Sequence, residues 1–304
     1  MITLTKIRDL NLSAAPSSNR PLHLSAASGL VCVNSFIYVI ADEELHLGVF
    51  RTANRDPGHL VRLFDGALAD SKTDRKKQKP DLEALTLIPA DRKYPNGALL
   101  ALGSGSRHNR RIGALLGLDA EGAVRGSPHV LDLSPVLAPL EDKFPALNIE
   151  GALVSGDELR LFQRGNTRHP ENAIIRFQLS AVLDALNLKR TGMVKPFAID
   201  LCDLGQIDGI PLCFTDAASL PDGDMVFTAV AEDTDDAYAD GPCVGAAIGI
   251  ADSNGLRCLH RLNQPYKVEG VDARMDGHTI RLLLVTDADD ADTPAGLFSA
   301  TMDR

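Results

Sequence analysis

The chain has 304 residues, with 31 basic and 41 acidic side chains and a formal net charge of −10 at pH 7. This charge argues against a nucleic acid or an anionic membrane as the main partner, and it favours a cationic ligand or a divalent metal. Residues 1–10 lack the basic and apolar regions of a signal peptide, and no apolar run approaches the roughly 18 residues of a membrane-spanning helix. The sequence therefore predicts a cytoplasmic protein without a membrane or nucleic-acid partner.

Short segments of alternating or continuous apolar character predict β-strands from the start of the chain. Residues 2–7 alternate between apolar and polar, but no hairpin partner lies nearby. A first hairpin is predicted over residues 23–33 and 35–42, followed by outer strands at 45–51 and 60–64.

Two segments between the predicted strands differ from this pattern. Residues 70–79 carry four lysines and one arginine, and they are predicted to form a solvated loop. Residues 180–186 predict a short helix with Ser180 as its N-cap.

Four further copies of the hairpin unit follow the first, beginning near Asp81, Asn148, Phe214 and Lys267. Most copies have two inner and two outer strands, but the last copy has only three strands before the chain ends. The solitary strand at residues 2–7 supplies the missing fourth, because a β-propeller removes its free edge by pairing the two termini. The sequence predicts an all-β, five-bladed β-propeller that forms a single domain over residues 1–304. Six blades is the alternative, if one long interval hides a degenerate blade.

In such a ring, the start of the first strand and the exit of the second strand of each blade meet at one channel mouth. The predicted starts are Ser28, Glu83, Glu150, Asp216 and Glu269. Carboxylates near a common axis repel one another unless a cation offsets them, and Ca²⁺ binds several oxygen ligands. Glu83, Glu150, Asp216 and Glu269 are therefore predicted metal ligands. The alternative is that each carboxylate bonds the backbone of the next blade and fixes the packing.

The exits of the second strands divide by charge. Blades two and three offer the basic side chains Arg107, His108, Arg110, Arg111, Arg164, Arg168 and His169, with Asn166 beside them. The other blades offer Asp42, Glu232, Asp233, Asp235, Asp236, Asp287 and Asp289. This asymmetry suits an anionic group held by arginine beside a metal. Arg107, His108, Arg164 and Asn166 are predicted to bind substrate, and Glu232 and Asp287 are candidate bases.

The glutamate-containing hairpins carry a family resemblance. The segments Asp81-Leu82-Glu83-Ala84-Leu85, Asn148-Ile149-Glu150-Gly151-Ala152 and Val268-Glu269-Gly270-Val271 resemble an uncharacterised family of bacterial β-propellers. More distantly, the hairpins are similar to those of phytase-like propellers and of five-bladed calcium-activated nucleotidases. In those proteins acidic residues of the channel mouth hold calcium, so the resemblance implies a Ca²⁺ site at the mouth.

These patterns favour a metal-dependent hydrolase of a phosphorylated or otherwise anionic small molecule, with Ca²⁺ or a similar ion polarising the scissile group or its attacking water. The competing hypothesis is a non-catalytic propeller whose mouth binds a sugar, a peptide or a protein. Fold alone does not choose between them. The five widely spaced cysteines include no Cys-x-x-Cys pair, so they predict buried free thiols rather than disulfides or a zinc site.

Overall fold

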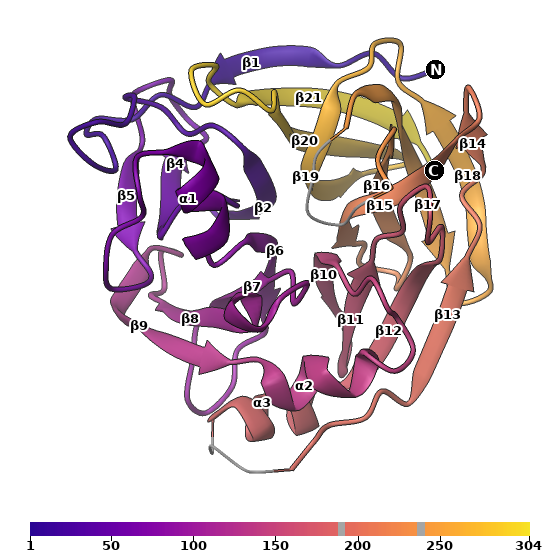
Figure 1. Cartoon of the computed structure of the whole chain (residues 1–304), viewed down its shortest axis with the longest axis horizontal. Helices are drawn as coiled ribbons and strands as arrows, with labels where there is room; N and C mark the ends of the chain where they lie inside the picture. Colours follow the sequence, from indigo (N-terminus) through magenta and orange to yellow (C-terminus); the bar gives the residue numbers. More distant parts are fainter. Residues whose placement is uncertain (188–191, 236–240) are drawn as a thin grey trace.

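A computed structural model describes residues 1–187, 192–235 and 241–304 of the chain, and within them five sheets surround a central axis (Figure 1). Blade 1 contains β2 (Ala27–Val33), β3 (Phe36–Ala41), β4 (His46–Arg51) and β5 (His59–Arg62). Blade 2 contains β6 (Leu82–Ile88), β7 (Ala98–Gly103), β8 (Ile112–Leu118) and β9 (Val124–Asp132). Blade 3 contains β10 (Ile149–Ser155), β11 (Glu158–Gln163), β12 (Asn172–Gln178) and β13 (Ala198–Cys202).

Blade 4 has one additional short strand, and blade 5 joins the two ends of the chain. Blade 4 contains β14 (Gln206–Ile207), β15 (Ile210–Ser219), β16 (Met225–Glu232), β17 (Cys243–Asp252) and β18 (Gly255–Arg261). Blade 5 contains β19 (Lys267–Asp276), β20 (Thr279–Asp287), β21 (Gly296–Asp303) and β1 (Thr5–Asp9). The helical segments are α1 (Lys72–Gln78), η1 (His108–Arg110), α2 (Ser134–Leu137), η2 (Ala138–Leu140) and α3 (Leu179–Asn187).

The ring is closed by the N-terminal strand, as the sequence predicts. Strand β1 pairs antiparallel with β21, from Thr5 opposite Ser299 to Asp9 opposite Gly296. Both ends of the chain therefore belong to one blade, and the edge that β21 would otherwise expose is covered. The five-bladed prediction is confirmed, and the six-bladed alternative is wrong.

Each innermost strand carries a β-bulge near its start. The register shifts skip one residue in each of the five blades: Ser28, Glu83, Glu150, Thr215 and Glu269. A bulge inserts an extra residue into one strand and re-aims its side chain. Equivalent side chains from five blades are thereby placed at the same level of the channel.

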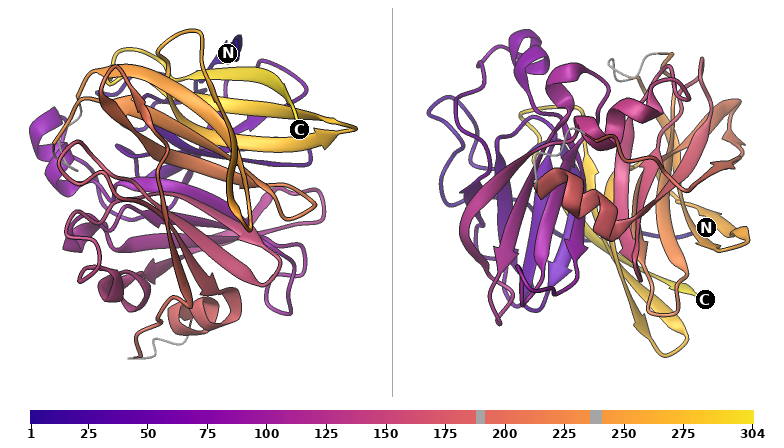
Figure 2. Two further views of the ribbon diagram at one scale, coloured as in Figure 1. Left: turned by 90° about the vertical axis from the view of Figure 1, so that its right-hand side faces the viewer. Right: turned by 90° about the horizontal axis from the view of Figure 1, so that it is seen from below.

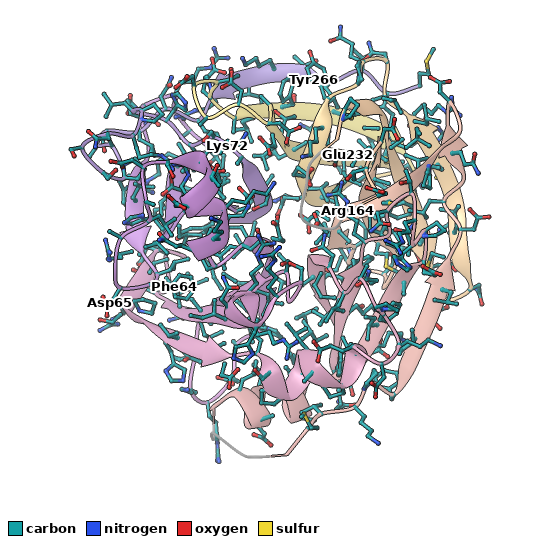
Figure 3. The ribbon with its side chains drawn as sticks, in the orientation of Figure 1. Phe64, Asp65, Lys72, Arg164, Glu232 and Tyr266 are labelled. Carbon is teal, nitrogen blue, oxygen red and sulfur yellow. The ribbon has the colours of Figure 1, made fainter. Side chains whose placement is uncertain are left out.

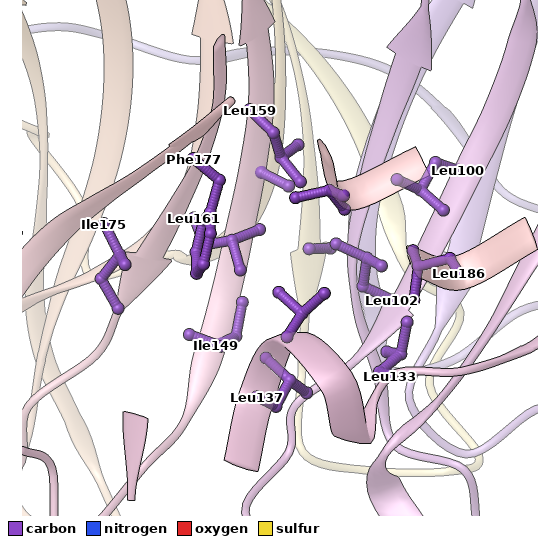
Figure 4. Packing of buried hydrophobic residues seen from close by; sticks show 14 of the residues in the cluster. Leu100, Leu102, Leu133, Leu137, Ile149, Leu159, Leu161, Ile175, Phe177 and Leu186 are labelled. Atoms are coloured by element: carbon purple, nitrogen blue, oxygen red, sulfur yellow. The ribbon is translucent and has the colours of Figure 1, made fainter. Parts of the chain in front are cut away.

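The blades pack through apolar side chains that alternate along their strands. Figure 4 shows part of the core between blades 2 and 3, where Leu102 faces Ile149 and Leu161 and the helices α2 and α3 add Leu137 and Leu186. Between blades 3 and 4, the rings of Phe162 and Phe214 meet edge to face. These layers are close-packed, so the inner strands are held at fixed spacing around the channel.

The segment predicted as a solvated loop forms helix α1 instead, so that prediction is wrong. Ser71 caps the helix by accepting a hydrogen bond from the Asp74 amide at 3.2 Å. Arg75 is only 4% exposed and donates to Glu43 at 2.9 Å, while Lys79 turns inward at the helix end. Because residues four apart share a helix face, two of the basic side chains point into the ring rather than into water. Figure 2 shows α1 and α2 at the same end of the ring.

The predicted helix near Ser180 is confirmed as α3, but it begins one residue earlier at Leu179, so Ser180 lies inside the helix and is not its N-cap. Among the residues that the structure describes, no helix has the length and apolar character needed to cross a membrane.

Candidate metal and ligand site at the channel mouth

All five blades contribute to a cavity of about 80 Å³ at the end of the channel next to α1. Its acidic lining residues are Asp42, Glu43, Asp81, Glu83, Glu150, Glu232, Glu269, Asp287, Asp289 and Asp290. Its basic lining residues are Lys72, Lys76, Lys79, Arg110, Arg164 and Lys267. Ten acids against six bases leave an excess of negative formal charge, which favours the entry of a cation.

Three of these carboxylates converge on one point. One oxygen from each of Asp42, Asp81 and Glu83 lies within 4.8 Å of the others. Asp42 follows β3 of blade 1, Asp81 precedes β6 of blade 2, and Glu83 is the bulged residue of β6. Carboxylate oxygens are the ligands that hard divalent cations prefer, so this triad can hold a metal ion.

Basic side chains fix Asp81 within the triad. Lys79 donates to Asp42 and lies 2.9 Å from Asp81, and Arg110 reaches the other Asp81 oxygen at 2.6 Å. The Ser104 hydroxyl donates to that same oxygen at 2.6 Å. Asp81 is held in the left-handed region at φ 57°, a conformation that Asp adopts more readily than most residues.

The other two carboxylates of the triad are less well satisfied. Asp42 Oδ1 is buried without a hydrogen-bond partner. Burial raises the pKa of Asp42, and it raises the pKa of Glu83 well above its usual range, with the Glu150 charge adding to the effect. A cation placed here would favour the ionised carboxylates and reverse both shifts.

Arg164 dominates the blade 3 and blade 4 side of the mouth. It contacts Glu150 at 3.2 Å and also donates to Glu232, and Figure 3 shows Arg164 and Glu232 near the ring axis. The remaining Glu150 oxygen accepts from Asn148 at 2.5 Å, and the remaining Glu232 oxygen accepts from the Gly241 amide at 2.6 Å. The Arg164 guanidinium thus already bridges two carboxylates on neighbouring blades.

Lys267 lies among the carboxylates of blade 5. Its ammonium is 2.6 Å from Asp289, but it is 3.7 Å from Glu269 and 3.9 Å from Asp287. Burial raises the pKa of Asp287 to about 7, although the Lys267 charge opposes the shift. The Glu269 oxygen Oε1 is buried and accepts no hydrogen bond.

Comparison with known proteins places the chain in a family. A model described as a family of unknown function (DUF6929) matches residues 23–302. The chain belongs to this family. No curated protein matches the chain. The resemblance to an uncharacterised β-propeller family is therefore confirmed for the DUF6929 chain.

Solved structures show only distant likeness to the DUF6929 chain. A mannose phosphorylase from Leishmania mexicana is 13% identical with a TM-score of 0.45, and the match covers 98% of this chain and 89% of that one. An α-L-arabinanase from Penicillium chrysogenum is 7% identical with a TM-score of 0.44, and 98% of each chain is covered. Kuenenia stuttgartiensis hydrazine synthase is 10% identical with a TM-score of 0.38; 92% of this chain is covered, which spans only 63% of the other.

Most of the residues predicted from the sequence line the cavity of the DUF6929 chain: Glu83, Glu150, Glu269, Arg164, Asn166, Glu232 and Asp287. The Asn166 side chain is already engaged, because its oxygen accepts from the amides of Arg168 and His169 at 3.0 and 2.7 Å. Asp236, also named at an exit, lies outside the described residues.

Asp216 is placed elsewhere. The bulge of β15 falls at Thr215, so Thr215 is the structural equivalent of the three glutamates and Asp216 is one residue out of register. A slip of one residue turns a side chain to the other face of a strand. Asp216 is fully buried, accepts from the Val271 amide of blade 5 at 2.9 Å, and is not among the residues that line the cavity. The structure thus separates it from the other predicted ligands.

Arg107, which precedes η1, and His108, its first residue, are exposed and do not line the cavity either. Arg110, three residues after Arg107, enters it instead and is only 2% exposed. The site also includes Lys79, Asp81 and Lys267, which were not predicted from the sequence. Their signal was their position next to the glutamate of the repeated hairpin, two to four residues before it.

Proposed function

We propose that the channel mouth binds a divalent cation at Asp42, Asp81 and Glu83 and uses it to hydrolyse a small anionic molecule. The convergence of the three carboxylates within 4.8 Å is the observation that carries this proposal. Asp42 Oδ1, buried and without a hydrogen-bond partner, is a free ligand atom in the same group. Ca²⁺ is the expected ion because it accepts irregular sets of oxygen ligands, and Mg²⁺ and Mn²⁺ are the alternatives.

The bound ion would polarise the scissile group or lower the pKa of the attacking water. Asp287 is the better placed of the two candidate bases. One of its oxygens accepts from the Asp289 amide at 2.8 Å, while the other lies 3.9 Å from the Lys267 ammonium. A pKa of about 7 also suits a general base at neutral pH. Glu232 is less suited, because Arg164 and the Gly241 amide already occupy its two oxygens.

The anionic group of the substrate would be met by the metal rather than by arginine. Arg110 and Arg164 both donate to carboxylates of the mouth, so neither presents a free fork to a phosphate. Lys72 and Lys76 of α1 line the same cavity and bring further positive charge to its rim. The substrate we expect is a phosphate ester or another small anion that can ligate the ion.

Thermal melting with Ca²⁺, Mg²⁺ or Mn²⁺ at low salt tests the metal site. The wild type should melt at a higher temperature in millimolar metal, because binding to the native state stabilises it. Asp42→Asn and Glu83→Gln should lose this increase, whereas Asp200→Asn, on the outer strand of blade 3, should keep it. An unchanged melting temperature in wild type with all three ions would rule out the proposal.

A hydrolysis screen of phosphate esters then separates binding from catalysis. Asp287→Asn should keep the metal-induced increase in melting temperature and lose turnover by about two orders of magnitude or more. If Asp287→Asn turns over as fast as the wild type, Asp287 is not the base.

One observation favours a non-catalytic alternative. Arg164 joins blades 3 and 4, and Lys79 joins blades 1 and 2, so the charged groups of the mouth also tie neighbouring blades together. On this alternative the mouth is a rigid platform for a sugar, a peptide or a protein. This alternative predicts that variants of the mouth carboxylates lose the same amount of stability with and without metal.

A further inference from the structure

Glu269, on the blade 5 side of the mouth, plays no part in the metal triad and is poorly satisfied. It is the bulged residue of β19, lines the cavity and is only 4% exposed. Its Oε1 accepts no hydrogen bond, and the Lys267 ammonium stands 3.7 Å away from it. A buried carboxylate without a hydrogen-bond donor costs free energy, so its presence calls for a partner.

The equivalent residues of two other blades bond a neighbouring blade directly, and that of a third is bonded within its own blade. Ser28 donates to the Leu82 carbonyl of blade 2 at 2.5 Å, and Thr215 donates to the Val268 carbonyl of blade 5 at 2.7 Å. Glu150 accepts from Asn148 and Arg164. Glu269 makes no link of this kind through Oε1, so a packing role does not account for it.

The charge balance around Glu269 differs from that of the triad. Five carboxylates (Glu150, Glu232, Glu269, Asp287 and Asp289) stand against Arg164 and Lys267, an excess of three negative charges. The triad of Asp42, Asp81 and Glu83 stands against Lys79 and Arg110, an excess of one. In formal charge, the blade 5 side therefore has the larger negative excess.

The geometry of this side selects the kind of cation. Among the described residues, the carboxylates around Glu269 do not bring three oxygens within 4.8 Å of one another, as the triad does. A compact metal ion requires such convergence, whereas an ammonium or guanidinium donates hydrogen bonds in several directions over a larger radius. Lys267 shows that an ammonium fits among these side chains, because it is bonded to Asp289 at 2.6 Å.

We propose that Glu269 binds the cationic amino group of the substrate. Together with the metal at the triad, this makes the substrate a zwitterion whose anionic group ligates the ion and whose ammonium or guanidinium lies against Glu269. The anionic half rests on the proposed function, but the cationic half does not need the metal. The two can therefore fail separately.

Calorimetric titration with 1,4-diaminobutane tests the cationic half in metal-free protein, in chelator and at low salt. Wild type should bind one equivalent, and Glu269→Gln should weaken the affinity about tenfold, the effect of losing about 1.4 kcal/mol. Glu269→Asp keeps the charge and should fall between them, while Asp200→Asn should bind as wild type does. Absence of binding, or equal affinity in wild type and Glu269→Gln, would overturn the assignment of Glu269.

A matched pair of phosphates tests the zwitterion in the presence of metal. Wild type should bind 2-aminoethyl phosphate about tenfold more tightly than ethyl phosphate, and Glu269→Gln should bind both equally, with its ethyl phosphate affinity unchanged. If neither phosphate binds while the diamine does, the metal site fails and Glu269 stands. If both phosphates bind wild type with equal affinity, the metal site stands and the zwitterionic substrate is wrong.

Discussion

The two ends of the channel are built from the same five innermost strands, yet they have opposite character. The mouth is crowded with charged side chains, whereas the cavity at the other end, of about 470 Å³, is lined by aliphatic residues such as Leu30, Leu85 and Leu153. Asp272 is the charged residue in the lining of that far cavity, and it accepts from the Cys32 amide of blade 1 at 3.0 Å. The charged group at the far end thus bonds a neighbouring blade, while carboxylate oxygens at the mouth are buried without a hydrogen-bond donor. This difference favours the mouth as the end at which a ligand would bind.

The largest difference in stability between the two ends should appear when one aspartate at each end is replaced by asparagine. Asp81→Asn leaves the buried Arg110 without its carboxylate and leaves Lys79 with only Asp42, and it should lower the free energy of unfolding by about 3–5 kcal/mol. Asn tolerates the left-handed backbone at this position, so the loss reports charge rather than strain.

Asp272→Asn is the matched change at the far end. It keeps an amide oxygen that can accept from Cys32 and removes the charge that faces Arg274 at 3.4 Å, so it should cost about 1 kcal/mol or less in urea unfolding. Equal losses in the two variants would mean that the mouth carries no special concentration of buried charge.

Next to the bulge of blade 3, the backbones of blades 3 and 4 approach each other closely. A Cβ on Gly151 would lie 2.9 Å from the Asp216 Cα of blade 4, so Gly151→Ala should destabilise the protein by about 1–3 kcal/mol. Gly192→Ala, where nothing lies within 4 Å of the added carbon, is the control and should be nearly neutral. Urea unfolding of both variants checks the prediction, and a neutral Gly151→Ala would show that blade spacing can relax.

These bulges also explain which parts of the structure the sequence could predict. The repeated hairpin and the solitary first strand were enough to predict five blades and their closure, because strand periodicity is a local signal. The alignment of Asp216 with Glu83 failed because a bulge adds one residue without altering the apolar pattern around it. Thr215 is not acidic, so only the register of strand pairing identifies it as the equivalent of the bulged glutamates in other blades.

The basic residues of the mouth were harder to predict for another reason. The charge of residues 70–79 resembles that of a solvated loop, and their inward direction depends on carboxylates contributed by other segments, such as Glu43 and Asp81. Likewise, choosing Arg110 over Arg107 required the short turn η1, which directs Arg110 toward Asp81. Long-range pairing of charges leaves no local signature in the sequence.

Hydrogen bonds between blades at the level of the bulges should have a smaller effect. Thr215→Val keeps the shape of the side chain but removes its bonds to the Val268 carbonyl and to Thr228, at 2.7 and 2.9 Å. We expect a loss of about 1 kcal/mol in urea unfolding, with no change in the metal-induced rise in melting temperature. A lost metal response in Thr215→Val would place this residue in the site after all.

The smallest expected effect is on the pH dependence of stability, and it reports on a single carboxyl group of the mouth. A carboxyl whose pKa is raised in the folded state binds its proton more tightly there than when unfolded, so stability decreases as the pH rises toward about 7. Metal-free protein should therefore melt a few degrees higher near pH 6 than near pH 8. Asp287→Asn should reduce this difference in thermal melts, and an unaltered profile would show that Asp287 does not titrate in that range.

The pairing of β1 with β21 has a consequence for how the protein is made. Thr5 lies opposite Ser299, so the fifth blade cannot form until nearly all of these 304 residues have left the ribosome. Until then blades 1 to 4 can form only an open arc, and β1 has no β21 with which to pair. The blade 5 wall of the cavity, which includes Lys267, Glu269 and Asp287, is therefore synthesised after the walls from the other four blades.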